Sequence, residues 1–247
     1  FTKDTSFNPS AQPGRGVTTA DWDQDGDLDV YVSNYRLVDN KLWRNNGNGD
    51  FSNAAPSHGA KGGTGHGIGS AFGDFNNDGL IDLFAGNFSH SGQPQSQFLL
   101  NRGPANDHKF NNIGTAGVTW VESYASPTFG DVDNDGDLDL YFTAVYSGDQ
   151  SHLWRNNLIE TGNLSFTDIT CSWSLCGLGS YEAAFADYDS DGYLDLVSNG
   201  AMYRNTGGNR NWIKVDLDGS GIYDLTAIGA QVRIDLGGGQ ILTRQVE

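Results

Sequence analysis

The sequence predicts an all-β protein, a β-propeller of four-stranded blades, and four observations lead to this prediction. An acidic nine-residue loop occurs four times, with its first aspartate at positions 21, 74, 131 and 187. The intervals of 53, 57 and 56 residues are typical of propeller blades. Each loop is followed by an alternation of β-branched and aromatic residues, which indicates a strand. Glycine is abundant, with 34 residues, which suits a β protein rich in turns.

The chain begins with residues 1–15, which we expect to form the closing strand of a preceding unit and a linker. Its Phe1-Thr2 is similar to the pairs that close later repeats, such as Phe51-Ser52 and Phe166-Thr167. Residues 16–205 then contain the four calcium-loop blades, and residues 206–247 form a further β segment. Four repeats are visible, and the two termini could complete a fifth blade, or the open edges could pair with another chain.

Each blade is expected to contain a first strand before the acidic loop, a second strand after it, and a third and fourth strand joined by an Asn/Gly turn. The first strands are predicted at 17–22, 69–72, 126–129 and 182–185, the second at 28–34, 81–87, 138–145 and 194–199, and the third at 41–45, 97–101, 152–156 and 201–205. Fourth strands are expected to begin at Phe51, Phe110 and Phe166. After position 205 the period breaks, and alternation predicts strands at 211–217, 228–235 and 240–246.

The four acidic loops have the composition of calcium sites. Oxygen-bearing side chains stand at loop positions 1, 3, 5 and 9, and glycine stands at position 6 in every copy. Ca²⁺ takes about six to eight oxygen ligands, and in such loops position 7 supplies its backbone carbonyl. We therefore predict about four Ca²⁺, one per loop. The predicted ligands are Asp21, Asp23, Asp25, Asp27, Asp29, Asp74, Asn76, Asp78, Leu80, Asp82, Asp131, Asp133, Asp135, Asp137, Asp139, Asp187, Asp189, Asp191, Tyr193 and Asp195.

The EF-hand is the main alternative for such a loop, and the sequence argues against it. An EF-hand needs a bidentate glutamate at position 12 and flanking helices. Position 12 is occupied here by Val32, Ala85, Phe142 and Ser198, and none of these is a calcium ligand. Because a strand pattern follows each loop, we expect the loop to be the turn of a β-hairpin.

The net charge of −17 is largely explained by these loops, which hold 17 of the 31 acidic residues. Four bound Ca²⁺ would bring the formal charge to about −9. We expect no nucleic-acid partner for so acidic a chain, and no apolar run is long enough to span a membrane. Cys171 and Cys176 are expected to form a local disulfide, with two free thiols as the alternative. Calcium loops and oxidised cysteines both favour an extracellular, secreted or cell-surface location.

The loops and the Leu-x-Arg-Asn third strands resemble FG-GAP (VCBS-type) repeats over residues 16–205. The tail, with Asn211-Trp-Ile-Lys-Val and Ala227-Ile-Gly-Ala-Gln-Val-Arg-Ile, resembles the start of the ASPIC/UnbV module. That module follows such repeats in the cartilage acidic protein-like family and its bacterial relatives. Propellers of these families often have seven blades, whereas four repeats are visible here. The resemblance implies a calcium-stabilised extracellular scaffold for adhesion, ligand binding or assembly.

No catalytic signature of the G-x-S-x-G, H-E-x-x-H or Cys–His type occurs, and we expect no catalytic residues and no enzyme. The favoured function is a binding or adhesion module whose partner is a protein or a glycan. The alternative is a self-assembling filament or surface-layer protein, in which propellers exchange strands with copies of themselves. The third hypothesis, a polysaccharide-active enzyme, would need a His, Tyr and Arg set or paired carboxylates in one pocket.

Overall fold

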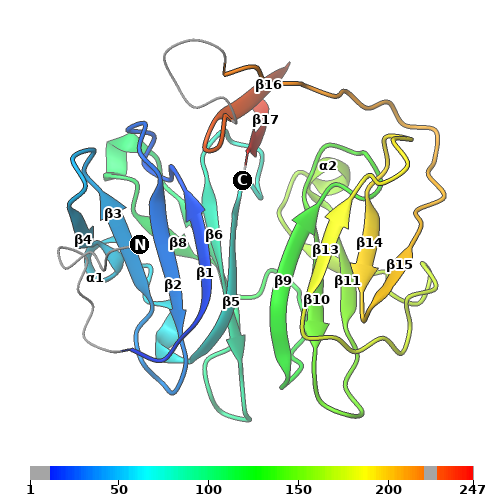
Figure 1. The fold of residues 1–247 in the computed structure, drawn as a ribbon, viewed down its shortest axis with the longest axis horizontal. Coiled ribbons are helices and arrows are strands. Elements are labelled where there is room, and N and C mark those ends of the chain that lie inside the picture. The colour runs from blue at the N-terminus through cyan, green and yellow to red at the C-terminus, as the bar shows by residue number, and fades with distance from the viewer. Residues whose placement is uncertain (1–11, 220–226, 247) are drawn as a thin grey trace. The chain divides into compact units, whose positions relative to one another are not determined.

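The computed structural model describes residues 12–219 and 227–246, and nearly all regular structure within them is β-strand (Figure 1). The strands form five sheets with antiparallel pairing, which confirms the predicted all-β class. The chain divides into two units, one with residues up to Phe72 and Leu80–Thr115, the other with Gly73–Gly79 and residues from Ala116 onward. The closing strand predicted near Phe1 lies outside the described residues.

The first unit contains two four-stranded sheets whose strands follow one another in chain order. The first sheet consists of β1 (Gly14–Ala20), β2 (Asp29–Asn34), β3 (Lys41–Asn45) and β4 (Phe51–Asn53). The second consists of β5 (His66–Gly73), β6 (Asp82–Phe88), β7 (Gln97–Asn101) and β8 (Phe110–Asn112). Short helical turns, α1 (Ala55–His58), Gly62–Thr64 and Pro104–Asn106, lie in the connections. The strands agree with the predicted ones to within a few residues at each end.

The core of the first unit is built around Trp22, which is fully buried. Its ring packs against His58, with centroids 5.1 Å apart, and against Phe110, at 5.5 Å. Apolar residues from both sheets, including Tyr31 and Leu83, complete this cluster. The residue at loop position 2 therefore fixes the acidic loop to the core.

The second unit contains a four-stranded sheet, a three-stranded sheet and a hairpin. They consist of β9 (Tyr124–Gly130), β10 (Asp139–Ala144), β11 (His152–Asn156) and β12 (Phe166–Asp168), then β13 (Ala183–Ala186), β14 (Asp195–Ser198) and β15 (Ala201–Tyr203), and finally β16 (Gln231–Gly237) and β17 (Gln240–Gln245). The short helix α2 (Leu158–Thr161) follows β11. The hairpin confirms the two strands expected near 228–235 and 240–246.

The predicted disulfide between Cys171 and Cys176 is present. The loop that it closes places Leu175, which is 7 % exposed, in the core of the second unit, where Leu153 and Leu196 also lie. Trp173 of the same loop packs against this cluster. The disulfide therefore holds an irregular segment whose apolar side chains cover the sheets.

The strand predicted at 211–217 is wrong, because residues 211–217 form no regular structure. Ile213 and Val215 are 70 % and 46 % exposed. Alternation of apolar and polar residues indicates a strand only where a neighbouring strand supplies the ladder of hydrogen bonds. The described residues supply no such ladder to this segment.

Candidate metal centres

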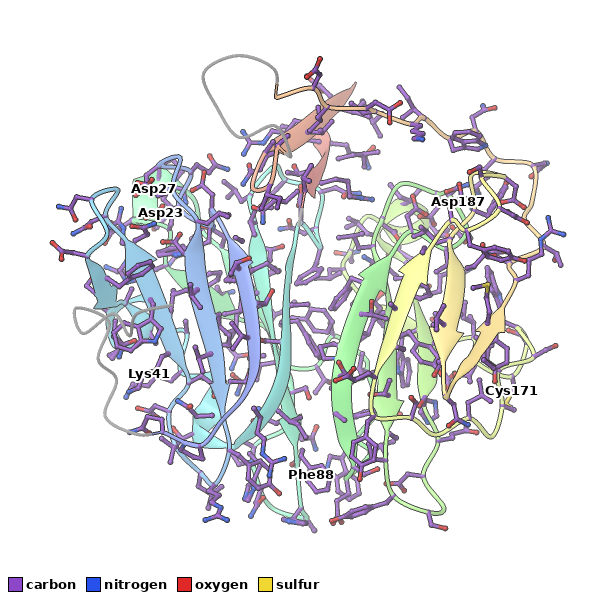
Figure 2. The ribbon with its side chains drawn as sticks, in the orientation of Figure 1. Asp23, Asp27, Lys41, Phe88, Cys171 and Asp187 are labelled. Carbon is purple, nitrogen blue, oxygen red and sulfur yellow. A yellow bond between two sulfur atoms is a disulfide. The ribbon has the colours of Figure 1, made fainter. Side chains whose placement is uncertain are left out.

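Each acidic loop joins the first and second strands of its sheet, as the hairpin prediction required. The loops that begin at Asp21, Asp74, Asp131 and Asp187 connect β1 to β2, β5 to β6, β9 to β10 and β13 to β14. Figure 2 shows Asp23 and Asp27 at the end of the first sheet where β1 leads into β2, and Asp187 beyond the end of β13. The sequence therefore places every predicted ligand set at the same end of its own sheet.

The four loops have the same pattern of hydrogen bonds between the position-1 aspartate and the loop backbone. In the first loop the Asp21 carboxylate accepts the amides of Asp25 at 3.0 Å and Gly26 at 3.1 Å. The position-1 aspartate accepts the same two amides in the other loops, namely Asp78 and Gly79 at Asp74, Asp135 and Gly136 at Asp131, and Asp191 and Gly192 at Asp187. The position-6 glycines all have positive φ, from 88° at Gly79 to 103° at Gly136, a conformation that glycine adopts without strain.

The carboxylates of positions 1, 3 and 9 come together in three loops. Each group offers oxygens within 4.8 Å of one another, a separation that one Ca²⁺ with Ca–O distances of about 2.4 Å can span. The groups are Asp21, Asp23 and Asp29, then Asp131, Asp133 and Asp139, and then Asp187, Asp189 and Asp195. In the second loop, Asp74, Asn76 and Asp78 belong to the second unit, and Leu80 and Asp82 to the first.

Several oxygens in these loops are buried without a hydrogen-bond partner among the described residues. They include one oxygen of Asp23, one of Asp29 and the Oδ1 of Asn76. A buried oxygen that accepts no hydrogen bond is costly, because it has lost its water. A cation that accepts these lone pairs removes that cost, so the donor set fits Ca²⁺.

Burial raises the pKa of the loop carboxyls. The pKa of Asp29 rises to about 8 and that of Asp23 to about 6, first because each is desolvated and then because other carboxylates stand nearby. Burial likewise raises the pKa of Asp74 and of Asp131 to about 6, and that of Asp139 well above its usual value. Without a cation, Asp29 therefore holds a proton near neutral pH.

Arginine side chains from outside the loops form ion pairs with the carboxylates of three loops. Arg44 pairs with Asp23 and lies 3.6 Å from Asp25. Arg204 lies 2.6 Å from Asp189 and 3.3 Å from Asp191, and Arg210 lies 3.0 Å from Asp133 and 3.2 Å from Asp135. In each case the guanidinium contacts the carboxylates of positions 3 and 5. These positive charges offset part of the repulsion within each loop.

An asparagine at the end of each third strand was missed as a site residue. The backbone amide of Asn156 donates to Asp139, at position 9, and its side chain donates to the carbonyls of Leu138 and Phe75. Phe75 stands at position 2 of the preceding loop. The same bond to the preceding loop joins Asn101 to Trp22 and Asn205 to Val132, whereas the hydrogen bonds of Asn45 to described residues stay within its own repeat. The recurrence of an asparagine at the end of each third strand was the sequence signal.

A separate aromatic cluster lies in the first unit, where the sequence showed only scattered histidines. His66 packs edge-on against Tyr35, with centroids 4.5 Å apart, and against His90, at 5.6 Å. The Arg15 guanidinium lies 4.9 Å above the Tyr35 ring. Burial lowers the pKa of His66. The cluster therefore brings together a His, a Tyr and an Arg, one of the two residue sets that a polysaccharide-active enzyme would need.

The repeated hairpin loop with its clustered aspartates defines a class of protein. A family model described as FG-GAP-like repeat matches residues 21–85 and 74–142. Residues 21–142 of the chain are therefore built from FG-GAP-like repeats. Among the described residues, no helix has the length and hydropathy that a membrane crossing requires.

Its curated relatives include cartilage acidic protein 1. The human protein is 28 % identical over 214 residues, which is 82 % of this chain and 32 % of the relative. The Xenopus tropicalis protein is 27 % identical over 191 residues, which is 74 % of this chain and 28 % of the relative. The chain thus spans about a third of the length of the curated relatives it matches.

Two solved structures show weak likeness. The Vibrio cholerae biofilm matrix protein Bap1 has a TM-score of 0.42 at 15 % identity, covering 83 % of this chain and 31 % of Bap1. An Agrocybe aegerita lectin that recognises non-reducing terminal N-acetylglucosamine has a TM-score of 0.42 at 15 % identity, covering 76 % of this chain and 51 % of the lectin. Likeness at this level assigns no ligand to the chain.

Proposed function

We propose that the protein is an extracellular, calcium-stabilised binding or adhesion module without enzymatic activity, whose sheets are the blades of a β-propeller. The observation that carries this proposal is the fourfold recurrence of one loop, with the same hydrogen bonds at Asp21, Asp74, Asp131 and Asp187. Unpartnered buried oxygens in these loops support a cation as the missing partner. The similarity to cartilage acidic protein 1 and the disulfide support an extracellular location.

In this proposal, each Ca²⁺ is held by the side chains at positions 1, 3, 5 and 9 and by the carbonyl at position 7 of one loop. In the first loop these are Asp21, Asp23, Asp25 and Asp29, with the carbonyl of Asp27. The ion supplies the positive charge that keeps the aspartates deprotonated and joins the ends of two neighbouring strands. Calcium here is structural, and the ligand of the module is a protein or a glycan.

The propeller arrangement is supported by the asparagine bonds between repeats. A side-chain amide reaches the position-2 carbonyl of the preceding loop at Asn101, Asn156 and Asn205. A contact that recurs from one repeat to the next implies that each repeat is placed in the same way against the one before it. The blades of a propeller are related in this way.

Calorimetry with calcium and then with EGTA tests the structural role. If the Kd of each loop for Ca²⁺ lies about a hundredfold below the free concentration of the ion, each ion stabilises the fold by about 2.7 kcal/mol. Removing the ions should then lower Tm by about 10 °C or more. Asp21→Asn should lose part of this shift, and the exposed Asp50→Asn should keep it. A Tm that is equal in calcium and EGTA would overturn the proposal.

A self-assembling structural protein is the second candidate, and the three-stranded sheet favours it. This sheet ends at β15 within the described residues, and edge strands recruit strands from other chains. Met202 on β15 is 53 % exposed and Val197 on the neighbouring β14 is 39 % exposed. The strands of this sheet therefore offer an apolar surface to a second copy of the chain.

A further inference from the structure

A second group of carboxylates lies beside the third loop. Asp135 and Asp137 of that loop and Glu160 of α2 offer oxygens within 4.8 Å of one another. Oxygens bound to one Ca²⁺ at about 2.4 Å lie no more than about 5 Å apart. The three carboxylates can therefore bind one ion with little movement. This group shares no member with the set formed by positions 1, 3 and 9.

Asp137 is the group's buried member. It is 0 % exposed, and its Oδ2 accepts the backbone amide of Ile159 at 3.1 Å. Its Oδ1 is buried and has no hydrogen-bond partner among the described residues. Position 7 serves the loop's own ion through its carbonyl, so this side chain has no role in that site. An unpartnered carboxylate oxygen in a group of acids indicates a missing cation.

Asp135 can take part in both sites, because its two oxygens differ in their contacts. Its side chain is 1 % exposed, its Oδ1 accepts the amide of Asp137 at 3.0 Å, and its Oδ2 lies 3.2 Å from Arg210. A carboxylate uses its two oxygens independently and can bridge neighbouring cations. Arg210 screens the repulsion between Asp135 and the other acids when no ion is bound.

Glu160 completes the group from the solvent side. Its side chain is 35 % exposed, and its Oε1 lies 3.8 Å from the Nη1 of Arg155. That separation is too long for a hydrogen bond, and the Nη2 of Arg155 donates to Asn157 instead. The Glu160 carboxylate is therefore held near the site by an ion pair that is weak at such exposure. Solvent access leaves room for water ligands.

We propose that Asp135, Asp137 and Glu160 bind a further hard divalent cation, Ca²⁺ in calcium-rich surroundings, next to the ion of the third loop. The other loops lack this site among the described residues. Position 7 is Leu80 in the second loop and Tyr193 in the fourth, and Asp27 of the first loop belongs to no comparable acidic group. The further ion joins the third loop to α2, in addition to the hydrogen bond that the Ile159 amide donates to Asp137.

Native mass spectrometry of the whole chain with added CaCl2 tests the site by counting ions. The four loops account for four ions under the proposed function, and we expect a fifth in the unchanged protein. Glu160→Gln and Asp137→Asn should each lose one ion. Glu182→Gln, an exposed acid outside the loops, is the control and should keep all five. Arg155→Gln removes the competing cation and should tighten the weakest step of a calcium titration several-fold.

The outcomes separate this site from the proposed function. Four ions in the unchanged protein, or five in Glu160→Gln, would overturn the further site and leave the calcium scaffold in place. Loss of the ion in Asp137→Asn with unchanged thermal stability in EGTA would support it and exclude misfolding as the cause. A protein that binds no calcium would overturn both proposals.

Discussion

At the scale of the residue, the buried aspartates connect the proposed calcium binding to pH. Burial raises the pKa of Asp29 to about 8 and that of Asp23 to about 6, from an ordinary value of 3.8. At pH values between the ordinary pKa of 3.8 and the raised pKa of about 8, the folded, metal-free protein binds more protons than the unfolded chain does. The free energy of unfolding therefore falls as pH rises through this range. A bound cation reverses the preference, since it requires the deprotonated carboxylates.

We predict that the metal-free protein loses thermal stability between about pH 4 and pH 8, whereas the stabilisation by calcium grows over the same range. Scanning calorimetry in EGTA and in calcium, at pH 5 and pH 8, measures both. Asp29→Asn should flatten the profile in EGTA, because it removes the carboxyl with a pKa near 8. A calcium-induced rise in Tm that is larger at pH 5 would contradict this prediction.

The asparagine at the end of the third strand makes a second prediction at this scale. The Asn156 side chain donates to the Phe75 and Leu138 carbonyls and accepts the amide of Leu158, and the residue is fully buried. Asn156→Ala leaves these groups unpaired and should cost about 3 kcal/mol in urea unfolding. Asn45→Ala, which among the described residues breaks bonds only within its own repeat, should cost about 1 kcal/mol. Equal costs would show that the bond between repeats contributes nothing.

The convergence of the loop carboxylates could be predicted from sequence, because alternation along a nine-residue loop fixes which side chains point to the same place. The contacts of Arg210, Glu160 and Asn156 could not, because their partners lie in other turns of the fold. Arg210 meets Asp133 from 77 positions away, and Asn156 meets Phe75 from 81 positions away. Only the recurrence of Asn at the end of each third strand hinted that this residue had a common role.

At the scale of the element, the β16–β17 hairpin supplies a positive charge to the loops of the second unit. The Ile241 amide donates to the carbonyl of Asn77 at 2.9 Å, and a side chain added at Gly136 would meet Leu242. Arg244 follows on β17, where burial lowers its pKa and the charges of Asp131 and Asp74 raise it. The hairpin therefore brings a guanidinium to carboxylates that Ca²⁺ would otherwise neutralise alone.

Replacing this charge should have opposite effects on the two forms of the protein. Arg244→Gln should lower Tm in EGTA by about 3 °C, because the carboxylates lose a counter-charge. It should also raise calcium affinity several-fold, because the ion no longer competes with a cation. Isothermal titration calorimetry with the exposed Arg233→Gln as control measures the second effect. Weaker calcium binding in Arg244→Gln would contradict this account.

The disulfide loop makes a separate prediction. Closing a loop of five to six residues stabilises a fold by about 2 kcal/mol if the effect lies in the unfolded chain. Replacing Cys171 and Cys176 by serine should cost about this much and should release Leu175 and Trp173 from the core. Urea unfolding followed by tryptophan fluorescence measures both changes. A double variant as stable as the parent would show that packing alone holds this segment.

The strands were predictable because glycines, asparagines and acidic loops mark the turns of nearly every hairpin. The short helix α2 was not, because four residues carry no periodic signal. The segment 211–217 shows the opposite error. Its alternation predicts a strand, but no strand among the described residues pairs with it. There the side chain of Trp212 lies against Gly192 of the fourth loop, a contact that alternation cannot reveal.

At the scale of the whole molecule, charge links calcium to association. The chain carries −17, and four bound Ca²⁺ reduce this to about −9. High net charge keeps protein molecules apart, so calcium weakens the repulsion between copies. At the same time, under the proposed function, ion binding would order the ends of the strands. Calcium could therefore either close a single module or bring modules together, and the mass of the particle in solution distinguishes the two.

We predict a monomer in calcium, measured by size-exclusion chromatography with light scattering, and a monomer of larger hydrodynamic radius in EGTA. Expansion at constant mass follows because the loops then repel internally and loosen. Assemblies that form in calcium and dissolve in EGTA would instead favour the self-assembling protein. In that case Met202→Lys, which places a charge on the exposed strand β15, should dissolve them without changing the calcium count. Assemblies that persist in Met202→Lys would show that another surface joins the copies.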